Sequence, residues 1–191
     1  MTRRLVLNIA MSLDGFIART DGSYDWIEGH GTNQYDTALQ FDNPAFFNAC
    51  DTVIMGRKSL EDCPLEMIAG YQAKEFIIAS RAEQTDYDNV RFVDNIVSEI
   101  ERLRAEEGGD IWLFGGAGLV QTCLEAKLID HFIIGIIPTI LGDGISLFDK
   151  LSDEQKLTLV ETTVTEALLC CAMTFGNKKG GPQWVHLFYI S

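Results

Sequence analysis

The segment of this sequence best suited to binding chemistry is the glycine-rich run Gly115-Gly116-Ala117-Gly118, between an apolar run and a helical pattern. Glycines let the backbone approach an anion closely. A helix that begins directly after them points free N–H groups and the positive end of its dipole at that anion. The run therefore fits a diphosphate. Because it lacks the G-x-G-x-x-G spacing, a tight turn that only needs positive φ explains it equally well.

Basic side chains follow two other predicted strands. Arg57 and Lys58 come directly after one strand and beside Ser59, and Arg81 follows Ser80 at the end of the next. A 2′-phosphate adds about −1.5 to −2 charge and prefers the bidentate geometry of arginine. On a chain this acidic, such residues favour NADPH over NADH as a ligand. A solvated surface cluster is the alternative, since Lys and Arg are mostly exposed.

The charge and cysteine content exclude several classes of protein. There are 15 Lys and Arg against 28 Asp and Glu, a formal net charge of −13, so nucleic acid and anionic membrane are unfavourable partners. Five cysteines without a C-x-x-C pair and three scattered histidines predict neither a disulfide framework nor a metal site. The apolar run at residues 5–10 is too short for a signal peptide. We expect a cytoplasmic protein whose partner is a small molecule.

Apolar runs and helical patterns alternate along most of the chain and must position these residues. Buried strands are predicted at residues 3–10, 52–55, 75–79, 90–93, 111–114 and 128–137. A short helix is predicted from Asn43, an amphipathic helix over residues 95–107 with Gly108 as its terminator, and a third from the glycine run to about residue 127. The polar stretch at residues 18–42 is predicted to be a functional loop.

The last part of the chain alternates β-branched and polar residues over 157–175 and again over 183–190. With the glycine-rich stretch 176–182 as the turn, this pattern predicts a closing antiparallel hairpin. The whole chain is therefore predicted to be an α/β fold of three layers, with a mainly parallel central sheet and an antiparallel C-terminal edge hairpin. Without a repeat or linker, we expect a single domain over residues 1–191.

Four segments together resemble the dihydrofolate-reductase-like superfamily. They are residues 10–18 (AMSLDGFIA), 51–59 (DTVIMGRKS), 76–81 (FIIASR) and 112–120 (WLFGGAGLV), in the order and spacing of that superfamily over roughly residues 3–150. The resemblance implies NADPH as the cofactor, with Ala10 and Ile17 bordering the nicotinamide. The cofactor-binding residues that follow from the resemblance and from the patterns above are Ala10, Ile17, Ala18, Gly56, Arg57, Lys58, Ser59, Ser80, Arg81, Gly115, Gly116, Ala117, Gly118 and Leu119.

Within the superfamily, further segments resemble the reductase domain of the riboflavin deaminase-reductase. They are residues 11–15 (MSLDG), 124–130 (LEAKLID) and 138–148 (PTILGDGISLF). We interpret the glycines of 138–148 as serving a bend of the fold rather than a ligand. The chain departs from that branch at Phe114, where the branch commonly has Glu before its diglycine, so the natural substrate can differ. The relatives also make a homodimer through the late strands an expectation.

The implied reaction is hydride transfer from C4 of the reduced nicotinamide to a polarised C=N or C=O bond. The resemblance also implies a carboxylate near the substrate. The stretch after the first loop offers Asp25, Glu28, Asp36 and Asp42. Asp42 is the closest match when counted back from Gly56, although a solvated side chain is the alternative for each. We assign Asp14, Trp26 and Phe46 to substrate binding, with a core role as the alternative for the two aromatic residues.

Three functions fit these patterns. The first is an NADPH-dependent reductase of a heterocyclic or ribosyl imine or carbonyl, resembling 5-amino-6-(5-phosphoribosylamino)uracil reductase. The second is dihydrofolate reductase activity, which the sequence disfavours because Gly31, not Asp, follows Trp26 by five residues. The third is a non-catalytic nucleotide-binding protein that keeps the fold. NADPH binding separates the third from the others, and the acceptor reduced separates the first two.

Overall fold

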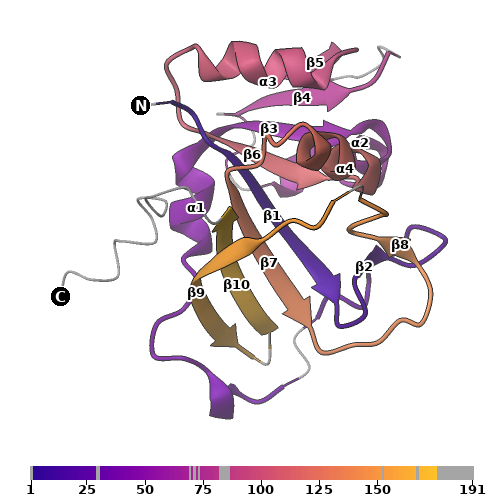
Figure 1. Cartoon of the computed structure of the whole chain (residues 1–191), viewed down its shortest axis with the longest axis vertical. Helices are drawn as coiled ribbons and strands as arrows, with labels where there is room; N and C mark the ends of the chain where they lie inside the picture. Colours follow the sequence, from indigo (N-terminus) through magenta and orange to yellow (C-terminus); the bar gives the residue numbers. More distant parts are fainter. Residues whose placement is uncertain are drawn as a thin grey trace. The chain divides into compact units, whose positions relative to one another are not determined.

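The chain divides into two compact units, and the first strand, β1 (Leu5–Ser12), contributes residues to both. The computed structural model describes residues 2–28, 31–68, 70, 72, 74–81, 87–151, 153–166 and 168–175. The first unit is Met1–Leu7 with Asn43–Ile129, and the second is Asn8–Asp42 with Asp130–Ser191. The eight strands of the main sheet follow the order β5-β4-β3-β6-β1-β7-β10-β9 (Figure 1). The single domain over residues 1–191 stays a prediction.

The first unit is built on parallel strands. These are β3 (Cys50–Gly56), β4 (Glu75–Ala79), β5 (Val90–Val93), β6 (Asp110–Gly115) and the start of β1. Each neighbouring pair is parallel. Val53, Ile54, Ile77, Ile78 and Leu113 are fully buried. Such continuous apolar runs are typical of a sheet covered on both faces, because both rows of side chains must then leave water.

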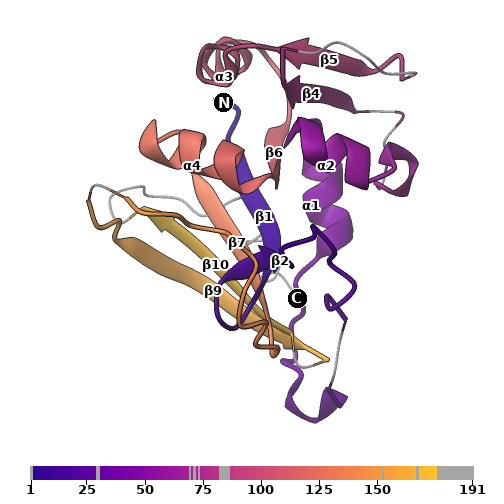
Figure 2. The ribbon, with the colours of Figure 1, turned by 90° about the vertical axis from the view of Figure 1, so that its right-hand side faces the viewer.

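Helices cover both faces of this parallel sheet. They are α1 (Asn43–Ala49), α2 (Arg57–Asp62), α3 (Ile96–Arg104) and α4 (Ala117–Glu125). Figure 2 shows α1 and α2 on one side of the strands and α3 and α4 on the other. The prediction of three layers around a mainly parallel sheet is confirmed.

Helix α3 shows how local sequence sets an element. The side chain of Asn95 caps its first turn by accepting a hydrogen bond from the backbone N–H of Ser98 (3.1 Å). Ile96, Ile100 and Leu103 are buried, as their spacing predicts. The predicted end at residue 107 is wrong, because the helix ends at Arg104. The N–H of Ala105 already turns back to the Arg102 carbonyl (3.0 Å), before Gly108 is reached.

The second unit is antiparallel. Its strands β7 (His131–Ile137), β10 (Leu168–Phe175) and β9 (Leu157–Thr165) pair in that order. A small separate sheet pairs β2 (Phe16–Ala18) with β8 (Ile145–Ser146). Over the described part of residues 18–42, a short 3₁₀ helix, η1 (Asn33–Tyr35), interrupts the predicted loop, and a second one, η2 (Leu65–Met67), follows α2.

The prediction of one continuous strand over residues 157–175 is wrong. The chain turns at Glu166, which has φ +47, so residues 157–175 form two strands rather than one. No glycine or proline marks this turn, so the sequence did not separate the two strands. The predicted turn 176–182 and strand 183–190 lie outside the described residues. The antiparallel C-terminal edge itself is confirmed. Across the described part of the chain, no helix is long and apolar enough to cross a membrane.

Candidate functional site

The register of the parallel strands brings three of the sequence motifs to one edge. Gly115 on β6 lies beside Met55, and the next residue of β3, Gly56, lies beside Ala79 on β4. Ser80 follows Ala79 directly, and its backbone N–H donates to the carbonyl of Val93 on β5 (3.1 Å). The carboxyl edge of a parallel sheet is where ligands bind in such folds. The glycine run, the Gly-Arg motif and the Ser-Arg motif therefore share the edge that fits a nucleotide.

The glycine turn has the geometry of an anion cradle. Gly115 has φ +141 and Gly116 has φ +98, a backbone that L side chains rarely adopt. Helix α4 starts directly after Gly116, which is its N-cap residue. Because glycine has no side chain, no side-chain hydrogen bond caps the start of this helix. Helix geometry directs the N–H groups of Ala117 and Gly118 out of that end. The tight-turn interpretation and the diphosphate interpretation are both compatible with this geometry.

The basic residues at this edge are partly neutralised by neighbours on the same helix. Arg57 Nε donates to Glu61 (2.7 Å), and its guanidinium carbon lies 6.0 Å from the ring centre of Phe92. Lys58 pairs with Asp62 at 3.0 Å. Pairs this exposed contribute little to stability, so a phosphate can compete for the cations. Arg81 is exposed at the end of β4.

Four of the predicted site residues lie on β1, β2 and the turn between them, in the second unit. Ala10 is on β1, Ile17 and Ala18 are on β2, and Asp14 is in the connecting turn. The Asp14 carboxylate accepts hydrogen bonds from the Ser12 hydroxyl (2.6 Å) and from the backbone N–H groups of Leu141 (3.1 Å) and Gly142 (2.7 Å). The Ser12 hydroxyl, with help from these N–H groups, lowers the pKa of Asp14 below its usual value.

Asp14 therefore anchors the segment 138–148 to the first loop. Gly142 has φ +80, and a side chain on Gly144 would collide with the carbonyl oxygen of Ala18. These contacts support the interpretation that the glycines of 138–148 serve a bend. All of these hydrogen bonds join Asp14 to other parts of the chain. Its assignment to substrate binding therefore stays a prediction.

The candidate carboxylates of the 18–42 stretch differ in their surroundings. Asp25 forms an ion pair with Arg19, and Asp36 accepts the backbone N–H of Glu166 (2.7 Å). Glu28 is exposed. Asp42 is half-buried directly before α1. Its assignment as the catalytic carboxylate stays a prediction.

The two predicted aromatic substrate residues have different environments. Trp26 is 5% exposed, and its buried Nε1 has no hydrogen-bond partner among the described residues. An indole N–H buried in this way can be satisfied by an acceptor atom of a ligand. Phe46 is fully buried, with its ring centre 5.5 Å from Phe47 and 5.6 Å from Trp112. Its assignment to the substrate site stays a prediction that this burial disfavours.

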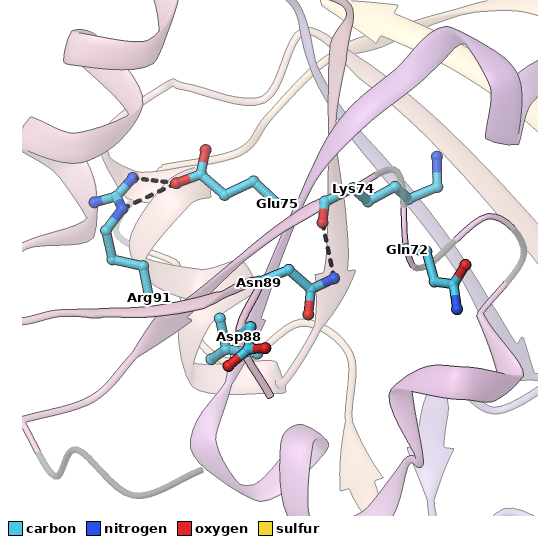
Figure 3. Close-up of a pocket in the computed structure, with 7 residues that line it drawn as sticks. Gln72, Lys74, Glu75, Asp88, Asn89 and Arg91 are labelled. Carbon is cyan, nitrogen blue, oxygen red and sulfur yellow. Dashed lines mark hydrogen bonds and ion pairs between the residues drawn. The ribbon is translucent and has the colours of Figure 1, made fainter. Parts of the chain in front are cut away.

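The structure also contains a polar hollow of about 500 Å³ (Figure 3). It is lined from the amino ends of β4 and β5, where Arg91 pairs with Glu75 (2.9 Å) and Asn89 donates to the Lys74 carbonyl (3.0 Å). The glycine turn lies at the carboxyl edge of the same sheet. The hollow therefore lies at the opposite end of the strands from the motifs that the sequence predicts to bind a cofactor.

Two of the cysteines, Cys50 and Cys123, are buried and unreactive. All five cysteines are free thiols. Burial raises the pKa values of Cys50 and Cys123 to about 12, so both stay protonated and unreactive at neutral pH. Among the residues with described positions, no group of His, Cys, Asp and Glu could hold a metal ion.

Comparison with known proteins identifies the family. The RibD C-terminal domain family matches residues 3–170. The uncharacterized protein YwjB of Bacillus subtilis (strain 168) is 39% identical over 168 residues, which are 85% of this chain and 92% of YwjB. The riboflavin biosynthesis protein RibD of Corynebacterium ammoniagenes is 26% identical over 155 residues, 75% of this chain but only 45% of that protein.

A solved structure supports the same fold. The putative riboflavin biosynthesis protein from Shewanella sp. PV-4 superposes with a TM-score of 0.77 and 23% identity, over 93% of this chain and 100% of that one. The chain belongs to the RibD C-terminal domain family, whose fold is the dihydrofolate-reductase-like α/β fold that the motifs predicted.

Proposed function

We propose that this protein is an NADPH-dependent reductase that transfers hydride to a C=N or C=O bond of a heterocyclic or ribosyl substrate. The observation that carries the proposal is the strand register that brings the glycine turn, the Gly-Arg motif and the Ser-Arg motif to one edge. Membership of the RibD C-terminal domain family agrees with it. A structurally similar protein of Thermotoga maritima, with a TM-score of 0.67 and 17% identity, is a diaminohydroxyphosphoribosylaminopyrimidine deaminase and 5-amino-6-(5-phosphoribosylamino)uracil reductase. That compound is the first acceptor to test.

The residues present fit a bound NADPH. A Cβ on Gly116 would lie 3.6 Å from the Ser59 hydroxyl oxygen, so the glycine leaves room between the two segments. No atom lies within 4 Å of the position of a Cβ on Gly118. The backbone N–H groups at the start of α4 would hold the diphosphate, and Arg57, Lys58 and Arg81 would hold the 2′-phosphate. NADPH supplies the hydride, and the chain orients cofactor and acceptor. Asp42 is the group that we assign to hold a proton near the acceptor.

The test is NADPH oxidation followed at 340 nm with 5-amino-6-(5-phosphoribosylamino)uracil and dihydrofolate side by side. We expect consumption of NADPH, much slower consumption of NADH, and turnover of the aminouracil rather than dihydrofolate. Reduction of dihydrofolate alone would establish the second function instead. Failure to bind either nucleotide in calorimetry would overturn the proposal. Light scattering of the same preparation tests the expected homodimer.

A further inference from the structure

The charges on helix α2 run against the helix dipole. Arg57 and Lys58 occupy its first two positions, and Glu61 and Asp62 occupy its last two. The amino end of a helix carries partial positive charge and the carboxyl end partial negative charge, so this order is unfavourable at both ends. In the i,i+4 pair of Arg57 with Glu61 the basic residue also comes first, which is the weaker order. Helix stability therefore does not explain the position of Arg57, whereas a bound anion at the carboxyl edge would.

Two contacts hold the guanidinium of Arg57. Its Nε donates to the Glu61 carboxylate (2.7 Å), and its central carbon lies 6.0 Å from the ring centre of Phe92. A cation at this distance over an aromatic ring is attracted by the negative face of the ring. The Arg57 side chain is 32% exposed and Phe92 is half-buried, so the ring orients the guanidinium while leaving it accessible to a ligand.

The strand register places the Phe92 ring near the other cofactor motifs. Phe92 on β5 pairs with Ile78 on β4, one residue before Ala79. Gly56, which directly precedes Arg57, pairs with Ala79 itself. The Ser-Arg motif begins at the next residue of the chain after Ala79. The ring therefore stands at the carboxyl edge, between strand ends that carry basic side chains.

The two contacts of Arg57 respond differently to a bound phosphate. A phosphate on the guanidinium would stand close to the Glu61 carboxylate, and the two negative charges would repel each other. The Phe92 ring has no net charge and causes no such repulsion. The ring is thus the contact that can hold the guanidinium in both the free and the cofactor-bound protein.

We propose that Phe92 is a positioning residue that determines the preference for NADPH over NADH. Its ring holds the Arg57 guanidinium at the carboxyl edge, where the proposed function assigns the 2′-phosphate. This inference rests on the proposed function, because that assignment belongs to it. A guanidinium that is already oriented loses less conformational freedom on binding, which raises the affinity for a phosphate. NADH has no 2′-phosphate, so its affinity should not depend on the ring.

The test is calorimetric titration of wild-type protein and variants with NADPH and with NADH. Phe92→Leu should raise the dissociation constant of NADPH roughly 2- to 5-fold, the range for a partly exposed cation–π contact, and leave that of NADH unchanged. Leu keeps an apolar side chain at this half-buried position, so the fold is retained. Phe92→Tyr keeps an aromatic face and should bind both nucleotides as wild type does. Phe148→Leu, which removes a 40% exposed ring in the second unit, is the control.

A double-mutant cycle tests whether the ring acts through the arginine. In an Arg57→Ala background, Phe92→Leu should cause no further loss of NADPH affinity. A further loss as large as in wild type would overturn the inference. An equal loss for NADPH and NADH in Phe92→Leu would also overturn it, because the ring would then support the fold or a part shared by both nucleotides. In either case the proposed function stands. If wild-type protein does not bind NADPH, the proposed function fails and this inference fails with it.

Discussion

Gly116 faces Ser59 across the carboxyl edge of the parallel sheet. A Cβ on Gly116 would lie 3.6 Å from the Ser59 hydroxyl oxygen and 3.8 Å from the Cα of Gly56. These are ordinary van der Waals distances, so space alone does not demand glycine. The demand comes from the backbone, because Gly116 has φ +98. The contact joins the glycine turn to the Gly-Arg motif, two segments far apart in the sequence.

Gly116→Ala is expected to destabilise the protein and weaken cofactor binding. Forcing an L residue to this φ costs about 1–3 kcal/mol, and relaxing the strain would move the start of α4. Urea unfolding measures the first effect and titration with NADPH the second. Gly118→Ala is the matched control for stability, because Gly118 lies within α4 with open space around it. It should be stabilising by about 0.5–1 kcal/mol. Equal stability of Gly116→Ala and wild type would contradict the strained turn.

Arg81→Ala is expected to reduce the preference for NADPH over NADH. Loss of one arginine from a 2′-phosphate removes a charge-assisted bond that contributes about 1.5–3 kcal/mol, or about 10- to 150-fold in NADPH affinity. NADH affinity should change little, because NADH has no 2′-phosphate. Lys156→Ala removes the same charge from an 85% exposed position in the second unit and serves as the control. An unchanged ratio of the two dissociation constants would remove Arg81 from the phosphate site.

The fold could be predicted largely because its signals are local. The bounds of β4 and β5 agree with the prediction at both ends, since each is a short, mostly apolar run with polar residues on both sides. The start of α3 was predicted within one residue, since the predicted helix began at Asn95, which is its cap. The turn at Glu166 was not, because a positive φ at a glutamate leaves no mark in the residue types on either side.

The candidate site could be predicted only where motifs follow strands. The order of the glycine, Gly-Arg and Ser-Arg motifs indicated one edge, and the register places them there. The contacts that decide the roles of single residues are long-range. The packing of Phe47 on Trp112 joins a helix to a distant strand, and the bonds from Asp14 reach Leu141 and Gly142. Residues this far apart in the sequence share no spacing pattern. Their roles could therefore be assigned from the sequence only by the chemical type of each side chain.

Glu99→Gln is expected to lower the free energy of unfolding at neutral pH and to have no effect in strong acid. The Glu99 side chain is only 10% exposed, and hydrogen bonds from Arg102 and then Arg91 hold its pKa at about 2. A depressed pKa stabilises the folded state above the ordinary value of 4.5, and that stability is lost as pH falls from there toward about 2. The two arginines are partly exposed, so we expect about 1–3 kcal/mol at pH 7.

Urea unfolding at several pH values between 7 and 3 measures this contribution. Glu101→Gln on the same helix is the control, because Glu101 is exposed and should change stability by less than about 0.5 kcal/mol. The difference between Glu99→Gln and wild type should shrink steadily below pH 4.5. A difference that is the same at pH 7 and pH 3 would show that packing, and not the charge of Glu99, stabilises this part of the fold.

Asp14→Asn is expected to loosen the segment 138–148. One oxygen of the Asp14 carboxylate accepts the Ser12 hydroxyl and the N–H of Leu141, and the other accepts the N–H of Gly142. An amide has one acceptor oxygen, so Asn must turn a donor toward one of these N–H groups. Amide hydrogen exchange should show lower protection at Leu141 and Gly142.

The same anchor should weaken in wild-type protein as the pH falls. The Ser12 hydroxyl holds the pKa of Asp14 below its usual value of 3.8, so its contribution is present above that value and is lost as pH falls through the lower folded-state pKa. Protection at Leu141 and Gly142 should decline over that acid range in wild type and stay low throughout in Asp14→Asn. Asp143→Asn is the control within the same segment, because the Asp143 carboxylate accepts the N–H of the neighbouring Gly144 (2.8 Å) and does not reach back to the first loop among the described residues. If both variants lose protection equally, the anchor is the segment's own turn and not Asp14.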